Sequence, residues 1–374
     1  MSKRTIRGRK GTVYLNVVER LLGEKKFLLF VAMAFIGAAF AVGNWHFAMW
    51  FGFVLTAYAA VSNDSIQTLG TFIESNGHRK WWVLWLYTGG ILLVTLTISY
   101  VVNDGDVTYG RLLDSEGNTD YPHPSEFSYF QLIAPIVLIV LTRLRMPVST
   151  TFLLLSVFSA DTSGITKVIG KSLTGYGLAF IVSFLVWIVA YRLISKHFSS
   201  RKVHPAWTVV KWVVSGALWS VWIMQDGANI AVYLPRRLEL WQFVIFAGTI
   251  FVGMALLFYL RGDKIQGVVS EKTGIADMRA ATLIDFSYVL LLIYKLFISS
   301  VPLSTTWVFL GIIGGREIAI GLARKKQGKK HKKKAFVLIW KDFAYAMVGL
   351  FISLALALGA NPSIREEIAN SLGF

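Results

Sequence analysis

Cysteine is absent from this sequence, and charged residues are scarce. The lack of cysteine excludes disulfide bonds and thiolate metal sites, so cysteine usage indicates no particular redox compartment. Only 16% of the 374 residues are charged while 55% are hydrophobic, and the mean hydropathy is +0.57. A soluble globule of this composition would expose a large apolar surface. We therefore expect a protein embedded in a lipid bilayer.

The motifs of common catalytic and metal sites are also missing. The six histidines are scattered, and no pair has the spacing of metal ligands on a helix, so we expect no transition-metal site. No Ser-His-Asp set and no P-loop can be recognised. The sequence therefore does not indicate an enzyme, and it gives no sign of an organic cofactor.

Apolar runs that suit bilayer crossing recur along nearly the whole chain. A crossing takes roughly 20 helical residues. Two further apolar stretches are interrupted by Ser-Thr-Thr. The pattern predicts an all-α polytopic membrane protein with about eleven crossings, two of them broken or re-entrant. The uninterrupted runs cover residues 27–42, 46–61, 81–102, 130–141, 175–194, 209–224, 241–260, 282–297 and 336–359.

The basic residues lie in the loops between these runs, which favours membrane sorting over nucleic-acid binding for the net charge of +17. Residues 1–26 and the loop 324–334 are then cytoplasmic, and the acidic loop 103–127 is external. The first apolar run lacks a small-residue cleavage site and is expected to be retained. The C-terminus is predicted outside the cell (inner) membrane. The basic segment 235–237, also predicted outside, is the main exception to the rule.

One polar pentapeptide occurs twice, as PVSTT at residues 147–151 and PLSTT at 302–306. Each copy follows an aspartate at the end of an apolar run, Asp64 for the first copy and Asp226 for the second. We expect a duplication with halves at 27–171 and 172–323. The charge pattern makes the second half inverted, provided that the first pentapeptide segment makes a net crossing and each half has about five spans. Residues 335–374 then form an extra helix and tail.

Inverted repeats with Pro-interrupted helices at matching positions are typical of transporters that bind substrate near the bilayer midplane. In each pentapeptide the proline favours the start of a new half-helix, with Ser149 and Ser304 as N-caps. A helix start and adjacent hydroxyls suit an oxyanion. Alternatively, these side chains only cap helices or pack between them. The predicted substrate-binding residues are Asp64, Ser149, Thr150, Thr151, Asp226, Ser304, Thr305 and Thr306.

The polar residues around the two aspartates suit a hard cation. Carboxylate, amide and hydroxyl oxygens are the ligands that Na⁺ shares with other hard cations. Protonated aspartates that carry a coupling proton are the alternative, and helix capping by the aspartates is another. The predicted cation-binding residues are Asn63, Asp64, Gln67, Gln225, Asp226 and Asn229.

The segment NDSIQTLGT at residues 63–71 resembles the signature of the inorganic phosphate transporter (PiT) family, and MQDGAN at 224–229 resembles its second copy. The two pentapeptides resemble the two hairpin motifs of that family, and Gly311 and Gly314 continue the second one. The resemblance covers about residues 27 to 325 in order and spacing. It implies cation-coupled uptake of inorganic phosphate by alternating access in a homodimer, with Na⁺ preferred to H⁺ as the coupling ion.

Several residues depart from the family pattern. Gln67 and Gln225 stand where the family has Asn, and Phe152 and Trp307 replace the histidine after Ser-Thr-Thr. Each Gln moves its amide oxygen by about one bond, which can shift a cation site. Val232-Tyr233 also replaces a Gly-Pro pair.

Retention of both aspartates favours phosphate over sulfate, because a protonated phosphate can donate to a carboxylate and sulfate cannot. A sulfate or other oxyanion permease of the same fold is the first alternative, and a non-coupled anion channel is the second. Among the other intramembrane charges, Glu74, Asp285 and Lys295 are interpreted as snorkelling or internally paired. Arg316 and Glu317 are candidates for lining the pathway.

Overall fold

A computed structural model describes residues 24–113, 117, 119–144, 146, 148–197, 204–259, 278–298, 304–323 and 328–372. These residues form helices and connecting loops without any β-strand, which confirms the predicted all-α class. Seven of the described helices are long and apolar enough to cross a membrane. They are α5 (Trp81–Val102), α7 (Thr162–His197), α8 (Ala206–Ala231), α9 (Leu240–Tyr259), α11 (Met278–Ile298), α12 (Thr305–Ala323) and α13 (Gly328–Ala360).

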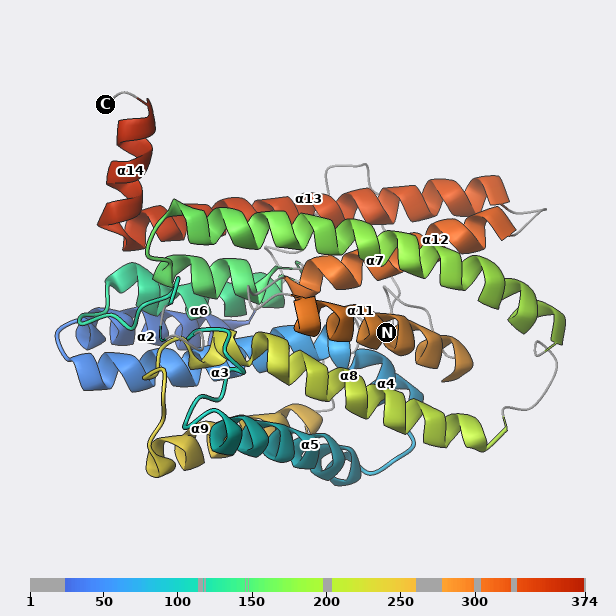
Figure 1. Cartoon of the computed structure of the whole chain (residues 1–374), viewed down its shortest axis with the longest axis horizontal. Helices are drawn as coiled ribbons and strands as arrows, with labels where there is room; N and C mark the ends of the chain where they lie inside the picture. The colour runs from blue at the N-terminus through green and yellow to red at the C-terminus, as the bar shows by residue number, and fades with distance from the viewer. Residues whose placement is uncertain are drawn as a thin grey trace, which may run out of the picture.

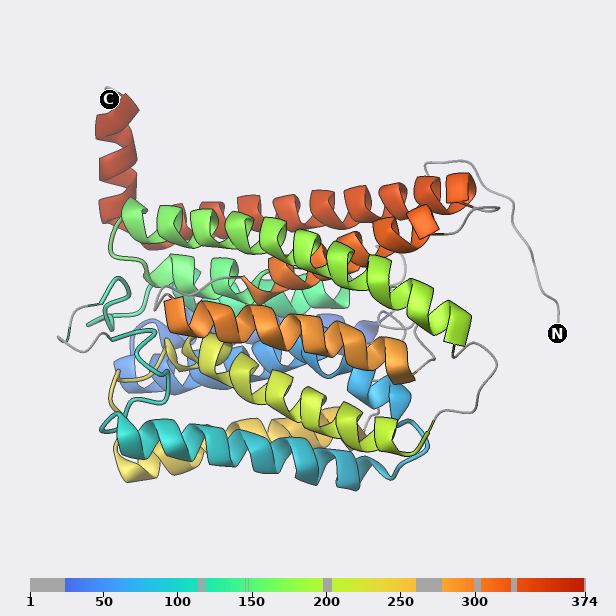
Figure 2. The same ribbon diagram turned by 45° about the vertical axis from the view of Figure 1, so that its right-hand side comes forward.

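The remaining elements are shorter or carry more polar residues. They are α2 (Lys25–Ala41), α3 (Trp45–Thr68), α4 (Gly70–Ser75), α6 (Tyr129–Arg143), the π-helix η1 (Thr151–Leu155), the 3₁₀-helix η2 (Ser156–Phe158) and α14 (Pro362–Leu372). The long helices α7 and α13 lie along one side of the bundle, and α5 and α9 pair on the opposite side (Figures 1 and 2). The predicted number of eleven crossings stays a prediction.

The acidic loop forms hydrogen bonds with several helix ends at one end of the bundle, which we call the loop end. Leu238 N–H donates to the Gly105 carbonyl at 2.9 Å, and Ala160 N–H donates to the Asp120 carbonyl at 2.9 Å. The indole of Trp45, at the start of α3, donates to the Pro124 carbonyl at 3.0 Å. The start of α3, the start of α7 and the connection from α8 to α9 therefore share this end, which lies on the left in Figure 1.

The first pentapeptide lies in a hairpin that opens at the loop end. Ser128 starts α6 with a capping box. After the turn, η1 and η2 lead back, and Gln131 of α6 donates to the Val157 carbonyl at 3.1 Å. The eight residues of η1 and η2 extend only about 12 Å, too little for a crossing. The prediction of a net crossing here is therefore wrong, because apolar length alone does not separate a half-helix that returns from one that continues.

The second hairpin, formed by α11 and α12, opens at the opposite end. Met278 at the start of α11 contacts Thr208 at the start of α8, with 3.5 Å between sulfur and hydroxyl. The Tyr288 hydroxyl donates to the Thr305 carbonyl at 2.8 Å and joins the two limbs. After α12, the chain enters α13, which returns to the loop end, where Asn361 donates to the Val157 carbonyl at 3.3 Å. The two hairpins therefore open at opposite ends of the bundle.

Each expected half contains one hairpin and three further helices longer than ten residues, α2, α3 and α5 in the first half and α7, α8 and α9 in the second. Three is an odd number, so the inverted repeat stays a prediction, as does the number of about five crossings in each half. The predicted boundary between residues 171 and 172 falls inside the continuous helix α7.

The basic patch at 236–237, the exception to the predicted charge rule, interacts with the acidic loop. The Arg236 guanidinium donates to the Tyr121 carbonyl at 2.7 Å, and Arg237 pairs with Asp104 at 2.8 Å. Asp104 therefore supplies a countercharge for Arg237, while backbone carbonyls accept from the Arg236 guanidinium.

Glycines allow α12 to pack directly on the backbone of α7. A Cβ atom at Gly315 would lie 2.2 Å from the Phe180 carbonyl oxygen, and one at Gly311 would lie 2.5 Å from the Tyr176 carbonyl oxygen. The four-residue spacing of these glycines is the small-residue pattern that brings membrane helices close together. The contact fixes α12, and with it the second hairpin, against α7.

Candidate anion and cation site

The ends of α3 and α8 meet the two hairpin tips inside the bundle. Asp64 belongs to the last turns of α3, and Asp226 belongs to those of α8. Both side chains are buried, as are all the other residues predicted to bind substrate or cation. The two carboxylates also interact electrostatically. The structure thus brings both predicted sets together in one place.

Both serines cap their half-helices in the same way, as the sequence predicts. Ser149 Oγ accepts from the Phe152 N–H at 3.1 Å, and Ser304 Oγ accepts from the Trp307 N–H at 3.3 Å. The threonines that follow each serine therefore lie in the first turn of a helix, where backbone N–H groups lack helical partners. The prolines expected to start these helices, Pro147 and Pro302, lie outside the described residues.

Asp64 connects α3 to the first hairpin. Its Oδ1 accepts from Asn63 Nδ2 at 2.8 Å, and its Oδ2 accepts from the Thr150 hydroxyl at 2.9 Å. Asn63 also donates to the Val148 carbonyl at 3.0 Å. Both oxygens of this carboxylate are thus oriented by neutral donors.

Asp226 contacts the same hairpin through the next threonine. Its Oδ1 accepts from Asn229 Nδ2 at 2.8 Å and from the Thr151 hydroxyl at 3.3 Å. Asn229 lies 3.2 Å from the hydroxyl oxygens of both Thr150 and Thr151. Two adjacent threonines on one hairpin tip therefore hold the two aspartates, one each.

The second hairpin joins this network through Thr306. Its hydroxyl accepts from Gln67 Nε2 at 3.0 Å and donates to the Val148 carbonyl at 3.2 Å. Gln225 is turned toward α11, where it donates to the Leu292 carbonyl at 3.2 Å. Both glutamines that replace the family's asparagines thus use their amide nitrogens within the protein.

Several buried oxygens in this site have no hydrogen-bond donor within the described part of the chain. They are Gln67 Oε1, Gln225 Oε1, Asp226 Oδ2 and Asn229 Oδ1. The amide oxygens can only accept hydrogen bonds, and so can the carboxylate oxygen while it is ionised. A buried acceptor without a donor costs about 1–3 kcal/mol. A hard monovalent cation such as Na⁺ satisfies oxygens of this kind without a hydrogen. The donor set therefore fits the predicted cation. The nearby Thr305 hydroxyl acts on the Asp226 carboxylate without forming a hydrogen bond of good geometry.

The aromatic residues at the family's histidine positions pack against each other. The rings of Phe152 and Trp307 lie edge to face, with centroids 5.7 Å apart at 87°. Trp307 also faces Phe343 of α13, at 6.0 Å between centroids. The two half-helix starts therefore meet through an apolar contact in place of two titratable side chains.

Tyr233, at the position of the family's Gly-Pro pair, closes the loop end above the site. Its hydroxyl donates to the Gln131 carbonyl at 2.5 Å. Its ring stacks on Phe127 at 6.0 Å and meets Phe158 edge-on at 4.8 Å. Gly52 of α3 leaves room for this ring, since a Cβ atom there would lie 2.2 Å from it.

Arg111 is a site residue that sequence reasoning missed. It belongs to the acidic loop, yet its side chain is buried and its charge acts on Asp226. Burial lowers the pKa of Arg111 to about 10, an effect opposed by the negative charge of Asp226, so the guanidinium stays charged at neutral pH. The only available signal was a basic residue in an otherwise acidic loop.

Arg316 and Glu317, predicted as pathway candidates, contact each other through Nη1 and Oε1. The Arg316 guanidinium also lies 5.1 Å above the ring of Trp187 in α7. These contacts direct the Arg316 side chain toward α7. Asp285 is internally paired, as one of the two interpretations predicted, and its partner is Lys211 of α8.

No protein-family model matches this chain, and no curated protein matches it. Among solved structures, one described as the sodium-dependent phosphate transporter is similar to it, with a TM-score of 0.49 and 16% sequence identity. The match covers 83% of this chain and 98% of that one. At this level of identity, the similarity assigns neither a substrate nor a coupling ion to the present chain.

Proposed function

We propose that this protein is a secondary transporter that imports inorganic phosphate together with Na⁺ by alternating access. The observation that carries the proposal is the meeting of two buried aspartates with two adjacent threonines at the tip of a hairpin. Neither aspartate has a lysine or arginine partner in an ion pair within the described residues. The site therefore holds negative charge that a transported cation and a protonated anion can use.

Phosphate fits the orphaned polar atoms of the site. Among the described residues, Asp226 Oδ2 and Thr305 Oγ1 form no hydrogen bond of good geometry, although the Thr305 hydroxyl lies close enough to act on the Asp226 carboxylate. A phosphate O–H supplies a donor to the carboxylate, and a phosphate oxygen accepts from the threonine. Sulfate has no proton at neutral pH and would face Asp226 with like charge. The positive charge of Arg111 adds attraction for either anion, so the O–H donor is what selects phosphate.

The orphaned oxygens favour Na⁺ over H⁺ as the coupling ion. Amide oxygens coordinate Na⁺ but do not carry a proton at neutral pH, and three of the four unmatched acceptors belong to amides. Two carboxylates and one anion in a dry site repel each other strongly. Bound Na⁺ reduces this repulsion, so that the site takes up the anion well only when the cation is present. This dependence couples the two fluxes.

Uptake of labelled phosphate into proteoliposomes tests the proposal. We expect accumulation driven by a Na⁺ gradient and lost when choline replaces Na⁺ at fixed pH. Excess sulfate should compete weakly. Full competition by sulfate would reverse the choice of substrate, and uptake unchanged in choline would remove Na⁺ as the coupling ion. Uptake that neither saturates nor accumulates phosphate against a gradient would indicate a channel.

Two variants connect the activity to the site. Thr150→Val removes the hydroxyl that binds Asp64, and Asp226→Asn removes the second carboxylate charge. Each should lower uptake by about tenfold or more, because a lost hydrogen bond to a charged group costs about 1.5–3 kcal/mol. Thr97→Val and Asp104→Asn change the same residue types at exposed positions and should leave uptake unchanged.

A further inference from the structure

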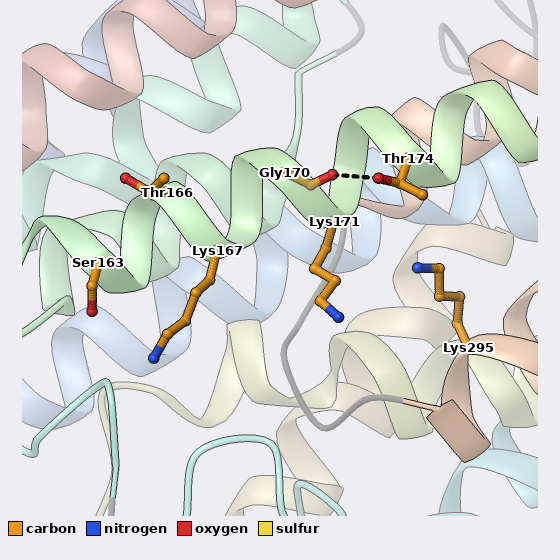
Figure 3. Close-up of a pocket in the computed structure, with 7 residues that line it drawn as sticks. All are labelled: Ser163, Thr166, Lys167, Gly170, Lys171, Thr174 and Lys295. Carbon is orange, nitrogen blue, oxygen red and sulfur yellow. Dashed lines mark hydrogen bonds between the residues drawn. The ribbon is translucent and has the colours of Figure 1, made fainter.

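A surface cavity of about 730 Å³ lies between the first half of α7 and the end of α11, outside the site described above. Lysines dominate its lining. Lys167 and Lys171 project into it from α7, and Lys295 projects from α11, as Figure 3 shows. All three amino groups extend into the space between these helices.

Among the residues that the structure describes, Lys167 is the only one of these lysines with a countercharge. Lys167 lies 3.2 Å from both carboxylate oxygens of Asp120 in the acidic loop. Among the described residues, neither Lys171 nor Lys295 forms an ion pair or a hydrogen bond through its amino group. Lys167 and Lys171 stand four residues apart, a spacing at which like charges destabilise a helix. The cavity therefore has an excess of positive charge.

Of the three lysines, Lys295 is the least exposed, so its unpaired charge is the least favourable. The residue is only 8% exposed, and lysine is almost never buried to that extent without a partner. An ammonium group without a countercharge is unfavourable in an apolar helix. Snorkelling, one of the interpretations from sequence, here carries the ammonium group into this cavity, where no described residue supplies a countercharge. An anion in this cavity would supply the missing charge.

The cavity also adjoins the candidate site through both helices. Lys171 precedes Ser172, whose Oγ accepts from the Ser304 N–H at 2.8 Å at the start of the second half-helix. Lys295 lies one turn beyond Leu292, whose carbonyl holds Gln225. The first turn of α7 is tied to the loop end through Asp120 and through α14, where Thr162 bonds Glu367. The cavity therefore lies on the loop-end side of the hydroxyl motif.

The hydroxyls that line the cavity are already donors within the protein. Ser163 donates to Asp161 at 2.8 Å, and Thr166 donates to the Thr162 carbonyl at 2.9 Å. The ligand must therefore be recognised by the ammonium groups themselves. Ammonium groups bind phosphate oxygens as point charges through charge-assisted hydrogen bonds. A cavity of this size accommodates a hydrated phosphate ion or a lipid headgroup.

We propose that this cavity is a second anion site, in which Lys171 and Lys295 bind a phosphate group. Binding of the anion does not depend on the proposed function. This site could also bind transported phosphate on the loop-end side before the anion reaches the aspartates, and that role does rest on the proposed function.

Binding of ³²P-labelled phosphate to the purified full-length chain in detergent tests the proposal. We compare the wild type with the Lys171→Gln/Lys295→Gln double variant. The double variant should lose saturable binding at this site, with affinity lowered at least about tenfold for each lost ammonium contact. The Lys171→Arg/Lys295→Arg variant keeps both charges and should retain binding, which separates recognition from misfolding. Thr150→Val, which alters only the central site, should retain it as well.

A lipid headgroup as the source of the phosphate group gives a different pattern. The chain purified from phosphatidylglycerol nanodiscs should then retain phospholipid in native mass spectrometry, and the double Gln variant should lose it. Retention of phosphate and of lipid by the double Gln variant at wild-type levels would overturn the proposal. The wild type could fail to take up phosphate while phosphate binding is lost in the double Gln variant and kept in the double Arg variant. In that case the proposed function is wrong, but the anion site stands.

Discussion

Lys211 of α8 and Asp285 of α11 form an ion pair with 2.6 Å between Nζ and Oδ2, and both side chains are fully buried. Thr71 of α4 accepts from Lys211 at 2.9 Å and donates to Asp285 at 2.5 Å. Ser215 donates to Asp285 at 2.7 Å. Three elements that carry or follow the candidate site, α4, α8 and α11, are therefore joined by a single polar cluster.

Breaking this pair from one side should destabilise the fold strongly. We expect Lys211→Met to lower the free energy of unfolding by about 3–5 kcal/mol, because it leaves the Asp285 carboxylate buried without its cation. Lys211→Met/Asp285→Leu should recover much of the loss. Thermal unfolding in detergent measures both. A double variant no more stable than the single one would mean that the charge pair is not the source of the loss.

The close contact between α12 and α7 predicts a sharp effect of one methyl group. Gly315→Ala places a Cβ atom against the backbone of Phe180, which cannot rotate away. We expect a loss of about 1–3 kcal/mol through overpacking. Gly253→Ala in α9 is the matched control, since a Cβ atom there meets nothing within 4 Å. Equal unfolding temperatures for the two variants would contradict the contact.

Gly52 and Tyr233 predict a coupled pair of substitutions at the loop end. Gly52→Ala should displace the Tyr233 ring and break its bond to Gln131. In a Tyr233→Leu background, Gly52→Ala should lower the free energy of unfolding by less than it does in the wild type. A double-mutant cycle should therefore show an interaction energy of about 0.5–3 kcal/mol. Gly90→Ala, with open space around its Cβ, should show no such coupling to Tyr233. If the changes in unfolding free energy of Gly52→Ala and Tyr233→Leu simply add, the contact between the two residues is contradicted.

His123 predicts a loss of stability in mild acid. Burial, opposed by a hydrogen bond to the Tyr233 carbonyl, lowers the pKa of His123 from 6.5 to about 4. As the pH falls below 6.5, His123 takes up a proton in the unfolded state, whereas in the folded state it does so only near pH 4. Stability from this group is therefore full above pH 6.5 and lost between pH 6.5 and 4.

The variant His123→Gln isolates this effect because glutamine can donate to the Tyr233 carbonyl but does not titrate. Unfolding temperatures measured from pH 7 to pH 4 should fall more steeply for the wild type than for the variant. Parallel curves would exclude His123 as the source of the acid sensitivity.

Local chemistry and repetition predicted much of the site. The serine caps follow from residue type, and the two copies of the motif indicate that Asp64 and Asp226 meet. The course of the first hairpin was mispredicted, because apolar composition suits a segment that returns as well as one that crosses. Arg111 and Lys211 were missed, because each acquires its role from a residue far away in sequence, Asp226 for the first and Asp285 for the second.

The backbone contact at Gly311 and Gly315 has a mechanical consequence. It leaves α12 no room to slide on α7, and the bond from Ser304 to Ser172 fastens the start of α12 to the same helix. The two helices must therefore rotate or tilt as one rigid body. The interface that can open lies on the other side of α12. There, among the described residues, a hydrogen bond from Thr306 to Val148 and the ring contact between Phe152 and Trp307 join α12 to the first hairpin tip.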